Sequence, residues 1–434
     1  MAQRKVDIIT LGCSKNLVDS ERLIGLFAAN GIAVRHDPDE EQRPSPTVVI
    51  NTCGFIGDAK EESVNTILQY AQAKNDGKIK ELYVMGCLSQ RYSEELPVEI
   101  PEVDGWYGKF NWHGIVDRMV KNASPGSTSF ERVITTPSHH AYIKISEGCN
   151  RYCAFCAIPL ITGRYKSRTI DDILAEVEAL VARGVKEFNV IAQDLSSYGI
   201  DIYGRMALPE LIDRMAGIKG VEWIRLHYAY PAQFPMEIAD VMARRPNVCK
   251  YIDIALQHIS DPVLKAMRRH IDAAGTRALL AELRKRVPGI HIRTTLMVGF
   301  PGEGETEFDE LIDFVKEQRF ERMGAFAYCE EDDTFAAQNL ADSIPDRVKQ
   351  DRLSRLMALQ EQISLEKQEE KIGNTLRVLI DREEDDYYVG RTEWDSPEVD
   401  PEVLVKKTRK LQRGEFCNVR VVQAFPFELI AEIV

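Results

Sequence analysis

The sequence predicts an α/β protein of three domains: a parallel α/β domain over residues 1–128, a partial (βα)6 barrel over 137–366, and a small β-barrel over 367–434. Apolar runs alternate with helical patterns through the first two parts, which is typical of parallel sheets covered by helices. A segment rich in Ser, Pro, Gly and Thr, residues 121–138, separates these parts as a linker. At 434 residues the chain is also too long for one ordinary core.

In the first domain, each of the predicted strands is followed by a cysteine. Cys13, Cys53 and Cys87 follow the apolar runs 6–11, 48–52 and 82–85, with helical patterns at 20–30 and 59–74. In a parallel, flavodoxin-like sheet the strand ends share one carboxyl edge, where ligands bind. Three thiols at one edge predict a metal centre; the alternative is that these small residues fill the core.

A second group of cysteines has the spacing C-x3-C-x2-C: Cys149, Cys153 and Cys156. A four-iron cluster held by only three cysteines leaves one iron free to bind another molecule. The alternative is a zinc site or buried thiols. Structural zinc sites usually have four ligands in two close pairs, and no fourth Cys or His follows nearby.

The central part contains alternating strand and helix patterns that predict a curved parallel sheet. The strand candidates are 141–146, 187–192, 223–230, 251–256, 291–298 and 324–328. The C-x3-C-x2-C segment follows the first of them, on the face where active sites of such barrels collect. Gln193, Asp194 and Gln257 follow other strands on the same face, and His227 is interpreted as a wall residue.

Composition predicts a soluble, cytoplasmic globular protein without a membrane segment. Apolar content is 44% and charged content 28%; no stretch approaches about 18 apolar residues, and no secretory signal is evident at the start. Nine cysteines in such a compartment indicate metal ligands or buried thiols rather than disulfides, and Cys249 and Cys329 are predicted to be buried. The net charge of −13 argues against binding nucleic acid mainly through phosphates, and leaves direct nucleic-acid binding uncertain.

The last part alternates short apolar runs with turns, which is typical of a small, OB-like barrel. The runs are 375–380, 387–390, 416–424 and 428–434. From residue 369 onward fifteen Asp and Glu stand against ten Lys and Arg. An acidic barrel suits a basic protein partner better than RNA; the alternative is an ordinary solvated surface. Residues 345–371 are expected to form an amphipathic helix that bridges to this barrel.

Several segments resemble known motifs. The Cys149–Cys156 segment is similar to the signature of radical S-adenosylmethionine (SAM) enzymes. Leu11-Gly12-Cys13-Ser14-Lys15-Asn16, Asn51-Thr52-Cys53-Gly54-Phe55-Ile56 and Gly86-Cys87-Leu88 resemble the cysteine motifs of the methylthiotransferase family. The Cys-Ser-Lys-Asn and Cys-Gly-Phe-Ile forms are similar to its RimO-type branch, which modifies a ribosomal protein, whereas the tRNA-modifying branch typically has Gln-Met-Asn. The final barrel resembles the TRAM domain of the same family.

The resemblance implies two 4Fe–4S clusters, with SAM bound at the second. Cys149, Cys153 and Cys156 would hold the radical-generating cluster, whose open iron binds SAM. Cys13, Cys53 and Cys87 would hold an auxiliary cluster that carries a sulfide or polysulfide. The predicted SAM-binding residues, by similarity, are Phe155, Gln193, Asp194, Gln257 and Val298. Arg164 and Arg168 follow the cysteine loop and are either carboxylate-binding or simply solvated.

The implied function is methylthiolation of an aspartate β-carbon in small-subunit ribosomal protein twelve, free or in the assembled subunit. The hydrogen of an unactivated C–H bond is not acidic enough to be removed by a base, so a radical must abstract it. An electron donor such as flavodoxin or ferredoxin would supply electrons. The alternatives are a tRNA adenosine methylthiotransferase and a two-cluster electron-transfer or sensor protein.

One segment departs from the family pattern. Residues 328–334 read Tyr-Cys-Glu-Glu-Asp-Asp-Thr, where the family often has a Tyr-Ser-Pro-Glu-Glu-Gly-Thr-like run. Asp333 stands in place of the glycine, so the turn geometry there is in question.

Overall fold

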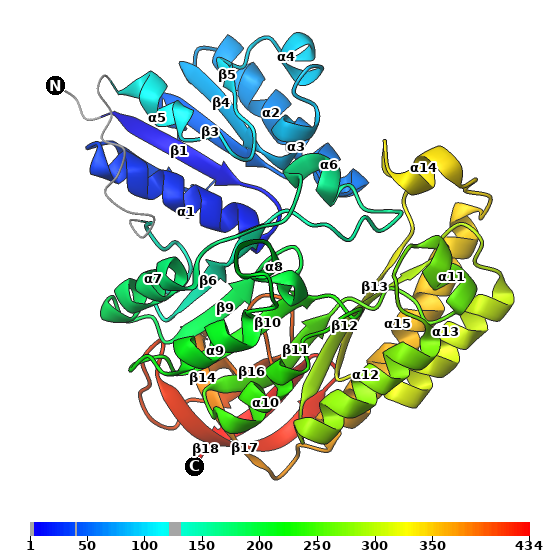
Figure 1. Ribbon diagram of the computed structural model, residues 1–434. Helices are drawn as coiled ribbons and strands as arrows, with labels where there is room; N and C mark the ends of the chain where they lie inside the picture. The colour runs from blue at the N-terminus through cyan, green and yellow to red at the C-terminus, as the bar shows by residue number, and fades with distance from the viewer. Residues whose placement is uncertain (1–3, 40, 121–131) are drawn as a thin grey trace.

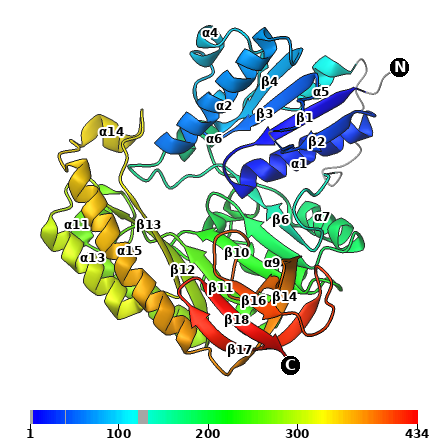
Figure 2. The same ribbon diagram turned by 180° about the vertical axis from the view of Figure 1, so that it is seen from behind.

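The computed structural model describes residues 4–39, 41–120 and 132–434, so most of the predicted linker lies outside the described residues. Figure 1 shows a parallel sheet with its helices at the top, a second sheet in the middle and a small barrel at the bottom. Figure 2, the view from behind, shows the small barrel lying against the strands of the middle sheet. The predicted three-part α/β architecture is therefore confirmed.

The first sheet is parallel and has the strand order β2-β1-β3-β4-β5, the flavodoxin-like order. Its strands are β1 (Lys5–Thr10), β2 (Ala33–His36), β3 (Thr47–Thr52), β4 (Glu81–Gly86) and β5 (Gly105–Trp106). Its helices are α1 (Ser14–Ala29), α2 (Gly57–Asn75), α3 (Cys87–Arg91), α4 (Leu96–Glu99) and α5 (Gly114–Met119). The sequence prediction omits β2 and β5, which are short edge strands and less buried than β3.

The middle sheet has six parallel strands in the order β13-β12-β11-β10-β9-β6, with β6 and β13 as its open edges. The strands are β6 (His140–Lys144), β9 (Glu187–Ile191), β10 (Trp223–Ala229), β11 (Val248–Ile254), β12 (His291–Val298) and β13 (Arg322–Ala327). The long helices are α7 (Ile170–Ala182), α9 (Leu208–Ala216), α10 (Glu237–Arg244), α12 (Ala273–Arg286), α13 (Glu305–Gln318) and α15 (Asp346–Glu369).

Short elements complete the loops of this part. They are β7 (Ser146–Glu147), α6 (Ile158–Thr162), β8 (Lys166–Ser167), the 3-10 helix η1 (Leu195–Ser197), α8 (Ile200–Tyr203), α11 (Asp261–Ala266) and α14 (Phe335–Asn339). Alternate strand residues such as Leu226 and Ile252 are buried in one apolar cluster with the helices. This cluster is the main core of the molecule, because apolar burial is the dominant stabilising term.

The last part is a closed barrel in the order β14-β15-β16-β18-β17. Its strands are β14 (Thr375–Glu383), β15 (Tyr387–Arg391), β16 (Glu402–Lys406), β17 (Phe416–Phe425) and β18 (Glu428–Ile433). Helix α15 bridges to it, as predicted, because Ser364 donates a 2.6 Å hydrogen bond to the carbonyl of Pro426. The sequence prediction omits β16.

Arginines on the inner face of the middle sheet, the face that its helices do not cover, bind the loop before β16. Arg225 donates to the carbonyl of Glu393 at 2.5 Å. Arg322 pairs with Asp395 at 2.5 Å, and Arg293 with Asp400 at 2.6 Å. Both aspartate side chains are buried, and so are those of Arg391 and Lys371 in the same part of the chain, so the buried charges of the last barrel offset one another in number.

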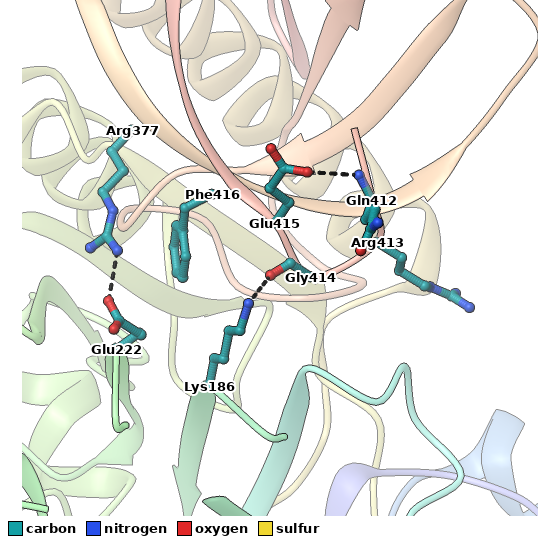
Figure 3. A pocket seen from close by; sticks show the side chains of 8 residues that line it. All are labelled: Lys186, Glu222, Arg377, Gln412, Arg413, Gly414, Glu415 and Phe416. Atoms are coloured by element: carbon teal, nitrogen blue, oxygen red, sulfur yellow. Dashed lines mark hydrogen bonds and ion pairs between the residues drawn. The ribbon is translucent and has the colours of Figure 1, made fainter. Parts of the chain in front are cut away.

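A cavity of about 340 Å³ lies where the middle sheet meets the last barrel (Figure 3). Two of its residues, Lys186 and Glu222, directly precede β9 and β10 and therefore lie at the amino end of the sheet, opposite the cysteines. Glu222 pairs with Arg377 at 2.7 Å, and Lys186 donates to the carbonyl of Gly414 at 2.6 Å. The cavity thus lies at the junction of two domains and is separate from the predicted site.

Candidate active site

The first cysteine set gathers at the carboxyl edge of the first sheet. Cys13 directly precedes α1, Cys53 follows β3, and Cys87 is the first residue of α3. The three thiols lie close enough to interact electrostatically. Gly12 has a φ of +91°, and a Cβ there would lie 2.7 Å from the Cβ of Cys53. Glycine is needed at this position for both reasons.

Asn16 joins the loops that carry these cysteines. Its side-chain amide donates 3.0 Å hydrogen bonds to the carbonyls of Leu11 and Thr52. Its Oδ1 accepts a 3.1 Å bond from Lys109 and lies 3.6 Å from the sulfur of Cys87. One buried side chain therefore fixes the strand ends after β1, β3 and β4, which explains the Asn in the motif.

The thiols of this set differ in acidity. Burial raises the pKa of Cys53, and raises that of Cys87 to about 12. Desolvation by the surrounding protein also disfavours the thiolate of Cys13, but the charges of Lys15 and Lys109 outweigh it and lower the pKa of Cys13. Buried thiols with a raised pKa remain protonated unless a cation compensates the thiolate, so this set fits a metal centre.

The second set lies in the loop between β7 and α6, at the carboxyl end of the middle sheet. Burial raises the pKa of Cys149 to about 12 and raises that of Cys156 further. The sulfur of Cys153 accepts a 3.3 Å hydrogen bond from Arg269 and lies 3.8 Å from the hydroxyl of Tyr230. The thiols thus converge in a partly buried recess lined by a cation.

One group of side chains outside the cysteine loops lies close enough to hold a single metal ion. Within residues 4–39, 41–120 and 132–434, the group of three ligand-type side chains whose atoms all lie within 4.8 Å is His139, His140 and Asp381. Asp381 is already paired with His139 and Arg391, each at 2.7 Å.

Gln193 and Asp194 lie beside the second cysteine loop but are engaged with protein atoms. Gln193 donates a 2.8 Å hydrogen bond to Glu147, while its Oε1 is buried without a protein partner. Asp194 pairs with Arg151 of the cysteine loop at 2.7 Å and accepts from the backbone N–H of Ser196 at 2.9 Å. Gln193 therefore retains a free acceptor for a ligand, whereas Asp194 holds the cysteine loop in place.

Of the other predicted SAM-binding residues, Gln257 follows β11, Val298 ends β12, and Phe155 lies in the second cysteine loop. Gln257 has a φ of +73°, and its Oε1 is buried without a protein partner. Val298 is fully buried, and its carbonyl accepts a 2.8 Å hydrogen bond from the N–H of Tyr328. Phe155 packs edge-on against Phe300 with ring centres 6.3 Å apart. The unpartnered oxygens of both glutamines fit a polar ligand at this edge.

The two cysteine sets adjoin each other. Cys87 packs against Ala157, the residue after Cys156, and against Ile161 of α6. Figure 1 shows α3 and α6 side by side where the upper sheet meets the middle one. A chain of buried charges continues this contact: Asp19 binds Lys109 of the first part and Lys144 of β6, and Lys144 binds Glu147.

The sequence analysis missed several residues at the site. Arg269 and Arg151 both lie over the ring of Tyr230, at 4.2 and 4.3 Å from its centre. Lys15 lies over the ring of Tyr228 at 3.4 Å. The two tyrosines at the end of β10 were a visible signal in the sequence, but Arg269 reaches the site from a distant loop that no spacing rule indicates.

Three lesser interpretations are settled by the contacts. Arg168 pairs with Asp172 at 2.7 Å and Glu176 at 2.6 Å, so it serves the fold. Cys329 is exposed, which contradicts the prediction of a buried thiol; Cys249 is buried as predicted. Asp333 adopts a φ of +62°, so the turn keeps the conformation that a glycine would have there.

Comparisons with known families agree with this division of the chain. Residues 5–108 match the Uncharacterized protein family UPF0004, residues 143–315 match the Radical SAM superfamily, and residues 372–434 match the TRAM domain. Among solved structures, the radical SAM methyltransferase TsrM of Kitasatospora setae has a TM-score of 0.55 at 15% identity, covering 74% of this chain and 73% of that one. At that identity the likeness concerns the fold alone.

Curated relatives match the whole chain. Ribosomal protein uS12 methylthiotransferase RimO of Parabacteroides distasonis is 58% identical over 433 residues and that of Phocaeicola vulgatus 58% over 434, with 100% of both chains covered in each case. The RimO protein of Cytophaga hutchinsonii is 48% identical over 431 residues, covering 99% of this chain and 98% of its own. Full-length identity at this level, together with the radical SAM match and two converging cysteine sets, shows that the chain belongs to the RimO family of radical SAM methylthiotransferases.

Proposed function

We propose that this enzyme adds a methylthio group to the β-carbon of an aspartate in ribosomal protein uS12. The names of the full-length relatives support this substrate. The observation that carries the proposal is the contact of Cys87 with Ala157 and Ile161, because it brings a second set of thiols against the radical SAM loop. Membership of the radical SAM superfamily implies a 4Fe–4S cluster and SAM, and the second set of thiols supports the proposal of a second cluster.

In this proposal Cys149, Cys153 and Cys156 hold the radical-generating cluster, and Cys13, Cys53 and Cys87 hold the auxiliary one. When bound, the clusters and SAM supply the radical, the sulfur and the methyl group. Phe155, Gln193, Asp194, Gln257 and Val298 border the SAM site. The auxiliary sulfide or polysulfide, and a flavodoxin or ferredoxin as electron donor, belong to the proposal as well.

The contacts of the chain suggest what its own residues contribute. Arg269 donates a hydrogen bond to the sulfur of Cys153 and thereby holds that sulfur in position. The Asp194–Arg151 pair orients the cysteine loop. The free Oε1 atoms of Gln193 and Gln257 can accept hydrogen bonds from SAM.

The proposed domains are 1–128, 137–366 and 367–434, and the proposed location is the cytoplasm. None of the helices in the part of the chain that the structure describes is long and apolar enough to cross a membrane.

Anaerobic reconstitution with SAM, reductant, uS12 and tRNA tests the function. Release of 5′-deoxyadenosine and a methylthio group on a uS12 aspartate, seen by mass spectrometry, are expected. Modification of tRNA alone would establish the tRNA-modifying alternative instead. Cleavage of SAM without modification of either acceptor would also contradict the proposal.

Single cysteine variants test the two clusters separately. We expect Cys153→Ala to abolish SAM cleavage, and Cys53→Ala to retain cleavage but stop sulfur insertion. Cys249→Ala is the matched control, because Cys249 is a buried thiol near the start of β11, away from both sets. Loss of cleavage in both site variants would argue against separate clusters.

A further inference from the structure

One cation at the rim of the first sheet reaches across to the middle sheet. Lys15 lies in the first turn of α1, two residues after Cys13, and its Nζ is 3.4 Å from the ring centre of Tyr228. Tyr228 lies near the carboxyl end of β10. This cation–π contact therefore joins the rim that carries the first cysteine set to the rim that carries the second.

The backbone around Tyr228 is shaped to present this ring. The pairing of β10 with β11 shifts register between Leu226 and Ala229, as at a β-bulge. Tyr228 has a φ of +66°, and its N–H donates a 3.3 Å hydrogen bond to Asp253. Bulges redirect side chains near active sites, and a left-handed tyrosine persists only where its surroundings impose it.

The charge of Lys15 lies between the rim of the first sheet and the rim of the middle sheet and acts on both. Lys15 follows Cys13 by two residues at the start of α1, so its charge lies close to the first cysteine set. Burial raises the pKa of Asp253, inside the middle sheet, to about 6, and Lys15 is among the cations that oppose this rise. The ammonium group thus lies within electrostatic range of the first cysteine set and of the barrel interior.

Within the part of the chain that the structure describes, Lys15 has no carboxylate partner, in contrast to the cations around it. The neighbouring pairs are Lys109 and Lys144 with Asp19, Arg151 with Asp194, and Arg293 with Asp400. Among the described residues, no carboxylate oxygen forms an ion pair with the Nζ of Lys15 within 4.0 Å. Lys15 is half-buried, so an anion entering the gap can reach it.

We propose that Lys15, held over Tyr228, binds the side-chain carboxylate of the substrate aspartate. This inference rests on the proposed function. In aspartate the carboxyl carbon is bonded directly to the β-carbon, so the group that holds the carboxylate must border both cysteine sets. Lys15 meets that requirement, and its charge would favour aspartate over asparagine at the modified position, because a charge-assisted hydrogen bond is stronger than a neutral one.

A binding cycle tests the assignment on the full-length, reconstituted enzyme. The dissociation constants of fluorophore-labelled uS12, and of uS12 with its target Asp changed to Asn, are measured by anisotropy. Lys15→Met is expected to weaken binding of uS12 by about 10- to 100-fold, and to leave binding of the Asn form nearly unchanged. Lys15→Arg is expected to restore part of the preference for aspartate.

Two further variants support the interpretation of this cycle. Lys219→Met is the matched control, because Lys219 is exposed in the loop before β10, at the amino end of the sheet. Tyr228→Leu changes no residue of the first domain and should reduce the preference for aspartate in the same direction, by a smaller factor. If Lys15→Met fails to load iron, the Tyr228→Leu enzyme provides the test of the binding preference in its place.

Each remaining outcome overturns the assignment. An equal loss for both forms of uS12 would make Lys15 a general docking charge. Unchanged binding with loss of sulfur insertion would assign Lys15 to the Cys13 centre instead. If the wild-type enzyme neither binds nor modifies uS12, the proposed function itself fails; if the wild type does both and the Lys15→Met enzyme binds equally well, only this inference fails.

Discussion

Arg91 and Glu331 form a buried ion pair, with Nη1 and Oε2 2.8 Å apart and side chains 4% and 5% exposed. Arg91 ends the helix that begins at Cys87, and Glu331 lies in the loop after β13. Lys60 of α2 binds the same carboxylate oxygen at 2.9 Å. This cluster fixes the first domain over the barrel, and with it the separation between the two cysteine sets.

Removing the charge of Glu331 should therefore uncouple radical formation from sulfur insertion. Glu331→Gln leaves Arg91 buried without a counter-charge, and breaking a buried pair costs about 3–5 kcal/mol. We expect the ratio of 5′-deoxyadenosine to methylthiolated product to rise, as measured by quantitative chromatography. Glu330→Gln, a change at the exposed neighbour, should leave the ratio as it is; a normal ratio in both variants would refute the docking role.

Asn16 should determine whether the first cysteine set can hold iron. Asn16→Ala leaves the buried carbonyl of Thr52 without its donor, a loss worth about 1–3 kcal/mol. We expect a lower thermal midpoint and about half the wild-type iron content, with SAM cleavage retained. Asn75→Ala at the exposed end of α2 should change stability by less than about 0.5 kcal/mol. Full iron loading of Asn16→Ala would contradict this account.

Replacing Asp333 by glycine should stabilise the loop after β13. A non-glycine residue at a φ of +62° carries backbone strain of about 1 kcal/mol, which glycine does not. Thermal unfolding should show a higher midpoint for Asp333→Gly. Asp385→Gly is the opposite control: Asp385 is exposed and is not among the positive-φ residues, so glycine there should lower the midpoint through chain entropy.

Stability should fall in acid because of a buried pair where β6 meets β9. Burial lowers the pKa of His140 from 6.5 to about 4, with the charge of Arg391 adding to the effect. Since the unfolded chain binds this proton first, stability is lost as pH falls from about 6.5 to 4, by on the order of 3 kcal/mol. Urea unfolding of the cluster-free chain at pH 7 and 5 measures the loss, and His140→Gln should reduce it.

Glu187, the neighbour of His140 across the sheet, adds a second pH range, at lower pH, in which stability is lost. Glu187 pairs with His140 in the strand register, and although burial opposes it, Arg391 and Arg225 hold its pKa at about 2 instead of 4.5. Its contribution is present above pH 4.5 and is lost towards pH 2. The His140→Gln variant should keep this second loss; a pH dependence identical to that of the wild type would refute the assignment to His140.

Much of the fold was predictable because its signals are local. The runs that end at Cys13, Cys53 and Cys87 are buried parallel strands, so their cysteines had to meet at one edge. The C-x3-C-x2-C loop is likewise a local pattern. The short edge strands β2 and β5 carry too few apolar residues to produce a comparable signal.

The contacts that complete the site depend on tertiary structure. Arg269 reaches Cys153 over 116 positions of sequence, and Glu331 reaches Arg91 over 240. In the tail, Asp395 and Asp400 are buried against arginines of the middle sheet that lie far away in the sequence. A sequence indicates that such charges exist but not which partner each one neutralises.

The arginines on the inner face of the middle sheet have a consequence for protein engineering. Arg225, Arg293 and Arg322 find their partners in the loop that spans residues 392–400. Exchanging the last barrel for that of a distant relative would leave these guanidinium groups facing a foreign loop. A chimera should therefore carry the arginines and this loop from the same protein, since the terminal barrel cannot be exchanged independently of the middle sheet.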